Sequence, residues 1–270
     1  MPVAWPAHLF LVGCGNMAGQ MLARWLACGL DPARVTVLRP SGRTVADGVR
    51  VVTDYPASLP ANSTVLLGMK PYQLADVAAS LSRICAADTC LVSILAGTPI
   101  ADLRRHFPMV RDIVRAMPNL PVGIGGGVIA LCADQATSAA AYDAVDALMA
   151  PLGLAERILD EGQFNEVTAR SGCGPAFLFR FIDAFARAGE AIGLSAEQSS
   201  RMALATVCGS ADLAKQAMDS SSVLADRVAS PGGMTRQGLN VLDADDRLLN
   251  LMIDTLTAAR DRGEEIARGG

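Results

Sequence analysis

The residues that could do chemistry begin with a glycine-rich turn near the N-terminus. Gly13, Gly15 and Ala18 fit the pattern G-x-G-x-x-G/A, directly after a short apolar run at 8–12. In this pattern the first glycine permits a tight turn, the second lets a pyrophosphate approach the backbone, and the small third residue allows close helix–strand packing. The first N–H groups of the following helix would face the phosphates. The turn predicts dinucleotide binding, and an ordinary tight turn is the alternative.

The segment after the next apolar run indicates which dinucleotide is bound. NAD-binding proteins of this kind usually have an acidic residue here, which holds the ribose hydroxyls. This chain has Arg39, Ser41 and Arg43 instead, with no acidic residue before Asp47. Guanidinium groups and a hydroxyl suit a 2′-phosphate. The prediction is NADPH, with NADH left open; the alternative is a pair of solvated loop arginines.

Two further segments carry groups suited to a ligand. Lys70, one of only two lysines, follows an apolar run at 64–68, so it would lie at the cofactor edge or bond to backbone carbonyls. Residues 230–235 read Ser-Pro-Gly-Gly-Met-Thr and precede a helical pattern. Serine at the N-cap and proline in the first turn favour a helix start, whose free N–H groups form an anion cradle. The expected ligand of this turn is a substrate carboxylate, and the alternative is a capped helix that binds no ligand.

The residue types that are missing narrow the reaction. A hydroxy-acid dehydrogenase needs a histidine oriented by an acid, but His8 precedes the first strand and His106 lies in a charged turn. The helical stretch at 161–192 has no lysine to serve as the proton donor of a β-hydroxyacid dehydrogenase. Carbonyl reduction therefore lacks its acid. Reduction of a C=N bond needs less help, because a protonated imine is already electrophilic.

Apolar runs that alternate with helical patterns predict the fold class. Strands are expected at 8–12, 35–38, 64–68, 90–94, 110–116 and 122–132, and the clearest helices between and after them at 71–84 and 135–150. This alternation is typical of a doubly wound, parallel α/β sheet. After about residue 160 the pattern is helical to the end. We expect a Rossmann dinucleotide-binding domain at 1–160 and an all-α dimerisation and substrate domain at 161–270.

Composition excludes several other classes. The 270 residues are 51% hydrophobic, and 23 basic against 27 acidic side chains give a net charge of −4. This balance argues against nucleic-acid and membrane partners, because both recruit an excess of positive charge. Seven cysteines without CxxC spacing, with two histidines, form no metal site and favour a reducing, cytoplasmic compartment. A mean hydropathy of +0.32 and an aromatic stripe at Phe177, Phe181 and Phe185 predict an oligomer with a buried interface.

Several motifs, in one order, resemble those of the pyrroline-5-carboxylate reductase family, whose members use NAD(P)H to make L-proline. They are GCGNMA (13–18), MKP (69–71), SILAG (93–97), RAMPNLP (115–121), SGCGPAF (171–177) and VASPGGMT (228–235). The resemblance covers essentially the whole chain, and the last two motifs are the most specific. It implies an N-terminal Rossmann domain and a C-terminal helical domain that interlocks two subunits; larger rings of such dimers, such as a decamer, also occur in the family.

The resemblance also implies site residues. The cofactor would contact Val12, Gly13, Cys14, Gly15, Asn16, Met17, Arg39, Ser41, Arg43, Gly68, Met69, Lys70, Pro71, Ile94, Leu95 and Ala96. The substrate carboxylate would lie on N–H groups near Gly233, Met234 and Thr235. Thr235 would be the catalytic residue, with its hydroxyl at the ring nitrogen, and Glu161 would lie near the substrate amine.

Some residues depart from the family pattern. Met234 stands where Thr or Ala is usual and would narrow the carboxylate pocket, and Tyr55 stands where an Asn often contacts the ribose. Cys173 and Asn165 replace a Ser and an Asp. None of these changes removes a group that the reaction requires. The expected function is NADPH-dependent reduction of 1-pyrroline-5-carboxylate to L-proline. The alternatives are a reductase of a six-membered cyclic imine carboxylate and an NADP-binding protein without turnover.

Overall fold

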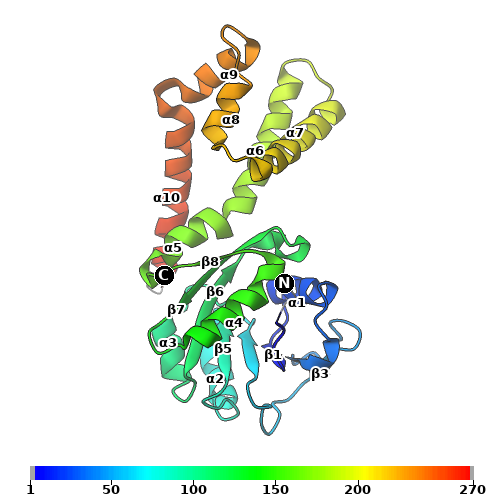
Figure 1. Ribbon diagram of the computed structural model, residues 1–270, viewed down its shortest axis with the longest axis vertical. Coiled ribbons are helices and arrows are strands. Elements are labelled where there is room, and N and C mark those ends of the chain that lie inside the picture. Colours follow the sequence, from blue (N-terminus) through cyan, green and yellow to red (C-terminus); the bar gives the residue numbers. More distant parts are fainter. Residues whose placement is uncertain (1–3, 268–270) are drawn as a thin grey trace. The chain divides into compact units, whose positions relative to one another are not determined.

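The computed structural model describes residues 4–267 and divides into two compact units (Figure 1). Unit 1 contains the chain up to Gly172 and again from Arg260, and unit 2 is Cys173–Ala259. The last strand ends at Arg157, close to the domain boundary expected near residue 160. Unit 1 nevertheless continues to Gly172, because Phe164 is buried in the same core as the strands.

Unit 1 is built on an eight-stranded sheet in the order β3-β2-β1-β4-β5-β6-β7-β8. The strands are β1 (Leu9–Val12), β2 (Val35–Leu38), β3 (Arg50–Val52), β4 (Thr64–Leu67), β5 (Cys90–Ser93), β6 (Asp112–Pro118), β7 (Gly127–Ala133) and β8 (Gly153–Arg157). Neighbouring strands are parallel except β6 and β7, which are antiparallel. The strand order reverses between β1 and β4, which places a topological switch point there. The predicted doubly wound α/β class is confirmed.

The structure corrects the expected strands in three places. The edge strand β3 was not expected, because it is three residues long and begins with the exposed Arg50. β8 was not expected either, since Gly-Leu-Ala-Glu-Arg has no β-branched residue and alternates weakly. The expected strand at 122–132 begins only at Gly127, because Leu120–Ile124 forms a 3-10 turn that ends on Gly125 with a φ of +75°.

Helices cover both faces of the sheet in unit 1. One face carries α1 (Asn16–Ala27) and α4 (Ala139–Met149), and the other carries α2 (Leu74–Leu81), α3 (Ile100–His106) and α5 (Phe164–Val167). Residues of β1 alternate between the two cores, with Leu9 and Leu11 in one and Phe10 and Val12 in the other. Short turns complete the described structure. The 3-10 turns of unit 1 are Pro32–Arg34, Pro71–Gln73, Leu120–Ile124, Ala150–Leu152 and Glu161–Gln163, and Thr168–Gly172 is a π-helical turn. Unit 2 has a 3-10 turn at Ala244–Asp246.

Unit 2 is helical. It comprises α6 (Gly174–Ala191), α7 (Ala196–Gln216), α8 (Ser221–Arg227), α9 (Met234–Asp243) and most of α10 (Arg247–Ala267). The Ser199 hydroxyl of α7 donates to the carbonyl of Ala186 in α6, and Gly189 leaves room for this serine. Phe181 and Phe185 of α6 stack on one another yet remain about half exposed within the single chain. Among residues 4–267, no helix is long and apolar enough to cross a membrane.

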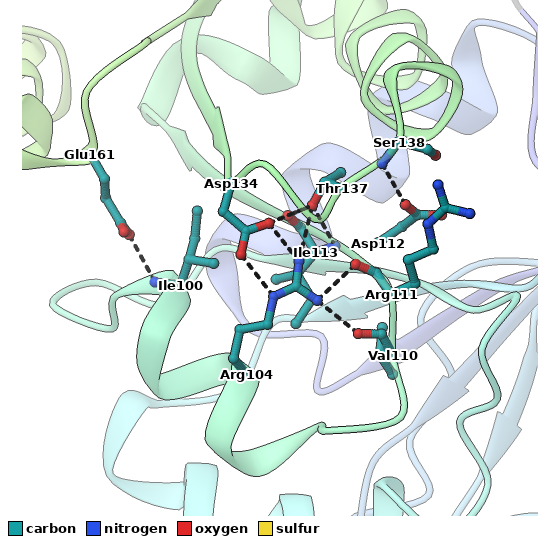
Figure 2. Close-up of polar contacts among 10 residues, drawn as sticks. All are labelled: Ile100, Arg104, Val110, Arg111, Asp112, Ile113, Asp134, Thr137, Ser138 and Glu161. Carbon is teal, nitrogen blue, oxygen red and sulfur yellow. Dashed lines mark hydrogen bonds and ion pairs between the residues drawn. The ribbon is translucent and has the colours of Figure 1, made fainter.

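A polar cluster ties α3 to the ends of β6 and β7 (Figure 2). Arg104 of α3 makes a two-point contact with Asp134, with Nε to Oδ2 at 2.8 Å and Nη2 to Oδ1 at 2.6 Å. Its Nη1 donates to the carbonyls of Val110 and Arg111. The Thr137 hydroxyl lies within hydrogen-bond distance of the same carboxylate and of Arg104. The cluster fixes the C-terminal half of α3.

We expect Asp134→Asn to lower the free energy of unfolding by about 1 kcal/mol at pH 7, because it removes a charge-assisted pair that solvent partly screens. Hydrogen bonding from Arg104 holds the pKa of the Asp134 carboxyl below its ordinary value of 3.8. Such a group contributes stability that is present above pH 3.8 and is lost as the pH falls through the lower, folded-state pKa.

Urea unfolding at several pH values checks this, with the exposed Asp47→Asn as the matched control. The stability curves of the wild type and Asp134→Asn should converge below pH 3.8. A gap that is independent of pH would contradict the ionic role of Asp134.

Candidate cofactor and substrate site

The glycine turn lies at the carboxyl end of β1, at the switch point of the sheet. Gly13 has a φ of +80°, and a Cβ there would lie 3.1 Å from backbone atoms of Met69. Glycine is therefore required both by conformation and by space. Gly68 follows β4, and a Cβ on it would lie 2.8 Å from the methyl group of Ala18. The small third position of the motif thus lets α1 pack closely against the end of β4.

Gly15 has the surroundings that a bound phosphate needs. It is the exposed N-cap of α1, with an extended backbone and no side chain that caps the helix. Nothing lies within 4 Å of the place where its Cβ would be. The first turn of α1 contains no acidic side chain, so its N–H groups and the helix dipole favour an anion. The turn therefore fits the pyrophosphate of a dinucleotide.

The other expected cofactor residues differ in accessibility. Val12 and Leu95 are buried, at 3% and 1% exposure, so only their backbone could reach a ligand. The half-buried residues are Cys14, Met17, Gly68, Met69 and Ile94, and the solvent-exposed residues are Asn16, Lys70, Pro71 and Ala96. Burial raises the pKa of the Cys14 thiol, and this keeps the group neutral and unreactive at pH 7.

The loop after β2 carries two guanidinium groups without acidic partners in the described part of the chain. Arg39 is joined to β3 by its N–H, which donates to the carbonyl of Val52 at 3.0 Å. A tight turn follows, in which Gly42 has a φ of +61° and its N–H donates to the carbonyl of Arg39. Arg39 follows directly on Leu38, whose carbonyl accepts the N–H of Gly13 at 2.9 Å, so the loop begins beside the glycine turn. Arg43 and Ser41 are exposed on the same loop.

Lys70 is exposed at the start of the 3-10 turn that follows β4. Its backbone N–H donates to the side-chain oxygen of Gln73 at 3.0 Å. Within residues 4–267, no backbone carbonyl accepts a hydrogen bond from its ammonium group. The ammonium group of Lys70 is therefore accessible, and its contact with the cofactor stays a prediction.

Glu161 lies in unit 1, at the start of the turn after β8. Its Oε1 accepts hydrogen bonds from Nη1 of Arg115 and from the backbone N–H of Ile100, each at 2.9 Å. The Arg115 side chain is only 7% exposed, and its guanidinium lies 4.2 Å above the centre of the Phe164 ring. Oε2 of Glu161 has no hydrogen-bond partner among the described residues. One carboxylate oxygen is thus held by the protein, and the other is open to a ligand.

Sequence reasoning did not single out Arg115. A signal was present, because an arginine in the middle of an apolar strand is unusual and must find a partner when buried. Sequence gave no sign of which acid that partner is, since Glu161 lies on a distant segment.

The expected anion cradle lies in unit 2, and its local structure differs from the prediction. The N–H of Gly233 donates to the carbonyl of Ser230 at 3.0 Å, and Gly232 has a φ of +72°. This is the pattern of a type II turn, with proline second and glycine third. Helix α9 therefore begins at Met234 with Gly233 as its N-cap, and Ser230 is not the cap. Thr235 still lies in the first turn of the ten-residue helix, which has no acidic side chain there.

The expected site residues fall into both units. The cofactor residues and Glu161 belong to unit 1, and Gly233, Met234 and Thr235 belong to unit 2. Met234 is 94% exposed, and Thr235 is exposed too, so the described residues of unit 2 leave this turn open.

The fold and the phosphate cradle define an NAD(P)-dependent oxidoreductase of the Rossmann type. Residues 9–97 match the profile of NADP oxidoreductases described as coenzyme F420-dependent, and residues 161–266 match that of pyrroline-5-carboxylate reductase dimerisation. A pyrroline-5-carboxylate reductase of Pseudomonas aeruginosa is 32% identical over 96% of this chain and 97% of its own length. One from Aquifex aeolicus is 35% identical over 86% and 88%. The chain belongs to the pyrroline-5-carboxylate reductase family.

Solved structures agree with this assignment. A pyrroline-5-carboxylate reductase of Coxiella burnetii has a TM-score of 0.89 and 30% identity, over 97% of this chain and 98% of that one. The pyrroline carboxylate reductase of Plasmodium falciparum, solved with NADP bound, shares the fold at a TM-score of 0.77 and 23% identity. The predicted family, the fold class and an NAD(P)H cofactor are confirmed.

Two alanine substitutions should separate binding from packing at the glycine turn. Gly15→Ala puts a methyl group into the open space beside the α1 N-terminus, so we expect NADPH affinity to fall about tenfold while the melting temperature stays unchanged. Gly68→Ala overpacks against Ala18, so we expect a loss of about 1–3 kcal/mol in the free energy of unfolding. Isothermal titration and thermal melts check both; equal melting temperatures for the two variants would refute this division of roles.

Proposed function

We propose that the protein reduces the C=N bond of 1-pyrroline-5-carboxylate with a hydride and a proton, forming L-proline and oxidised cofactor, in the last step of proline biosynthesis. The observation that carries this proposal is similarity over nearly the full length to reductases named for that substrate. The local geometry supports it, because the chain has one helix N-terminus suited to a pyrophosphate and a second suited to a carboxylate.

In this proposal unit 1 binds and orients the cofactor. The N–H groups at the start of α1 hold the pyrophosphate, and Arg39 and Arg43 hold a 2′-phosphate, with Ser41 adding a hydroxyl. NADPH is accordingly the preferred cofactor. When bound, it supplies the hydride. The segments that follow β4 and β5 bound the site on the side of the nicotinamide, with Lys70 at its exposed rim.

Unit 2 binds the substrate carboxylate in this proposal. The N–H groups of Met234 and Thr235, in the first turn of α9, have no hydrogen-bond acceptor among the described residues and are available to the anion. The Thr235 hydroxyl orients the ring nitrogen. In unit 1, Oε2 of Glu161 has no hydrogen-bond partner among the described residues and is available to the substrate amine. The protein contributes orientation and electrostatic stabilisation rather than a strong acid.

The position of His8 agrees with a reaction that needs no histidine. Its ring nitrogens lie 3.0 Å from the Ser63 hydroxyl and 3.2 Å from that of Thr36, at the amino end of β1. This is the opposite end of the strand from the glycine turn. Burial lowers the pKa of His8, so the ring is neutral at pH 7.

The chain self-associates through a recognised dimerisation domain at 161–266. Unit 2 leaves apolar side chains exposed on α6 and α10, among them Phe179, Phe181, Phe185, Leu251 and Ile253. We propose that these surfaces are covered in a homodimer, and that such dimers form a larger ring such as a decamer. A cytoplasmic location and the absence of nucleic-acid and membrane partners stay predictions.

Replacing both Arg39 and Arg43 with alanine should raise the KM for NADPH about 10- to 100-fold and leave the KM for NADH unchanged, because only NADPH carries the 2′-phosphate. Steady-state kinetics with each cofactor measure this. Arg34→Ala, an exposed arginine in the preceding turn, is the matched control. Equal increases in the KM for NADPH and for NADH would show that these arginines do not contact the 2′-phosphate.

Thr235→Ala should lower kcat/KM for the imine by one to two orders of magnitude, about 1–3 kcal/mol, because it removes the hydroxyl at the ring nitrogen. Thr235→Ser keeps the hydroxyl and should restore most of the rate. The assay follows NADPH oxidation at 340 nm with 1-pyrroline-5-carboxylate and with its six-membered homologue. An unchanged rate in Thr235→Ala would show that this residue has no role in the reaction. A preference for the larger ring would show that the substrate is a six-membered cyclic imine.

A further inference from the structure

Helix α3 is held at both ends by carboxylates that come from other segments (Figure 2). At its start the N-cap is Pro99, which has no side chain that can accept a hydrogen bond. Oε1 of Glu161 accepts the N–H of Ile100 instead, at 2.9 Å. At its other end Arg104 makes the two-point contact with Asp134. Glu161 thus replaces the missing cap and places negative charge at the positive end of the helix.

The start of α3 determines where the loop at 94–99 lies. This loop joins the carboxyl end of β5 to α3, and β5 is the neighbour of β4 in the sheet. The N–H of Ile94 donates to the carbonyl of Leu67 at 3.2 Å, so the loop leaves the sheet beside Gly68. Carboxyl ends of strands near a switch point are where open α/β sheets bind ligands. The loop is therefore a wall of the cofactor site, held by β5 at one end and by α3 at the other.

Arg115 holds Glu161 in the position that this cap requires. It lies in β6, its side chain is 7% exposed, and Glu161 is its only acidic partner among residues 4–267. Its Nε is buried without a hydrogen-bond partner, and its guanidinium stacks on Phe164. A buried guanidinium needs a counter-charge, so the pair resists any displacement of Glu161 from the sheet. Arg115 itself is too deeply buried to touch a substrate.

We propose that Arg115 is a positioning residue, which through Glu161 fixes the start of α3 and thereby orders the loop at 94–99 for the cofactor. The inference rests on the proposed function only in requiring a nicotinamide dinucleotide. It assigns Oε1 of Glu161 to the protein rather than to the substrate. Loss of the contact would let the loop leave its binding-competent arrangement, and the apparent Kd rises in inverse proportion to the competent fraction.

The experiment measures NADPH binding by titration calorimetry and amide hydrogen exchange of the loop at 94–99 in the protein without ligand. The variants are Arg115→Met, which keeps the volume of the side chain, Arg115→Lys, Glu161→Ala and Glu161→Gln. The exposed Glu156→Gln on β8 is the matched control, since this carboxylate has no hydrogen-bond partner in the described chain.

We expect Arg115→Met and Glu161→Ala each to raise the Kd for NADPH about tenfold and to speed exchange of the loop amides, with no further loss in the double variant. Glu161→Gln keeps an acceptor for Ile100 and should fall between Glu161→Ala and the wild type. Arg115→Lys keeps a positive charge and should bind NADPH more tightly than Arg115→Met but less tightly than the wild type. The control should match the wild type.

Unchanged NADPH affinity and unchanged loop exchange in Arg115→Met and Glu161→Ala would overturn the proposal. A higher KM for the imine with an unchanged Kd for NADPH would also overturn it, because that pattern assigns Glu161 to the substrate alone. The binding measurement needs no imine. Failure to reduce 1-pyrroline-5-carboxylate would therefore refute the proposed function while leaving this test intact.

Discussion

The carboxyl ends of β1 and β4 approach each other so closely that no side chain fits between them, and the cofactor site depends on this approach. Gly13 lies against the backbone of Met69, and Gly68 lies against the methyl group of Ala18. The same contacts that join the strands to α1 also expose the N–H groups of its first turn around Gly15. One steric constraint thus accounts for the small residues at these positions, beside the helix N-terminus that the proposed phosphate site uses.

Two ion pairs hold the segments at the ends of α3 in place. β5 and β6 run antiparallel to β7 and β8, so strand pairing alone does not hold α3 to the segments that follow β7 and β8. Buried or half-buried charges take that role: Arg104 with Asp134 at one end of α3, and Arg115 with Glu161 at the other. Removing one partner would leave the other without compensation, so each pair specifies one arrangement of its loop. The geometry of the proposed site therefore depends on contacts that charged side chains make within the protein, and not only on groups that face a ligand.

Much of this was readable from sequence, and the reasons for the misses are physical. Long apolar runs predicted β1, β2, β4 and β5, because buried parallel strands require them. The sequence pattern does not predict β3 and β8, because edge strands are short and need less apolar sequence. The start of α9 was misplaced, since Ser-Pro-Gly-Gly satisfies both the rule for a helix cap and that for a type II turn. The pairing of Arg115 with Glu161 joins segments distant in sequence, and no local pattern reveals such a contact.

The two anion cradles differ in a way that suits the proposed chemistry. In the proposed cofactor cradle the charges of Arg39 and Arg43 add to a helix N-terminus, which would suit a phosphate with more than one negative charge. The cradle at α9 relies on N–H groups, and the one arginine in its first turn, Arg236, is paired with Asp226 at 2.7 Å. A free cation beside a protonated imine would disfavour its charge and so its reactivity toward hydride. Neutral N–H donors would bind the carboxylate of the proposed substrate without that cost, and the pairing of Arg236 with Asp226 is consistent with this arrangement.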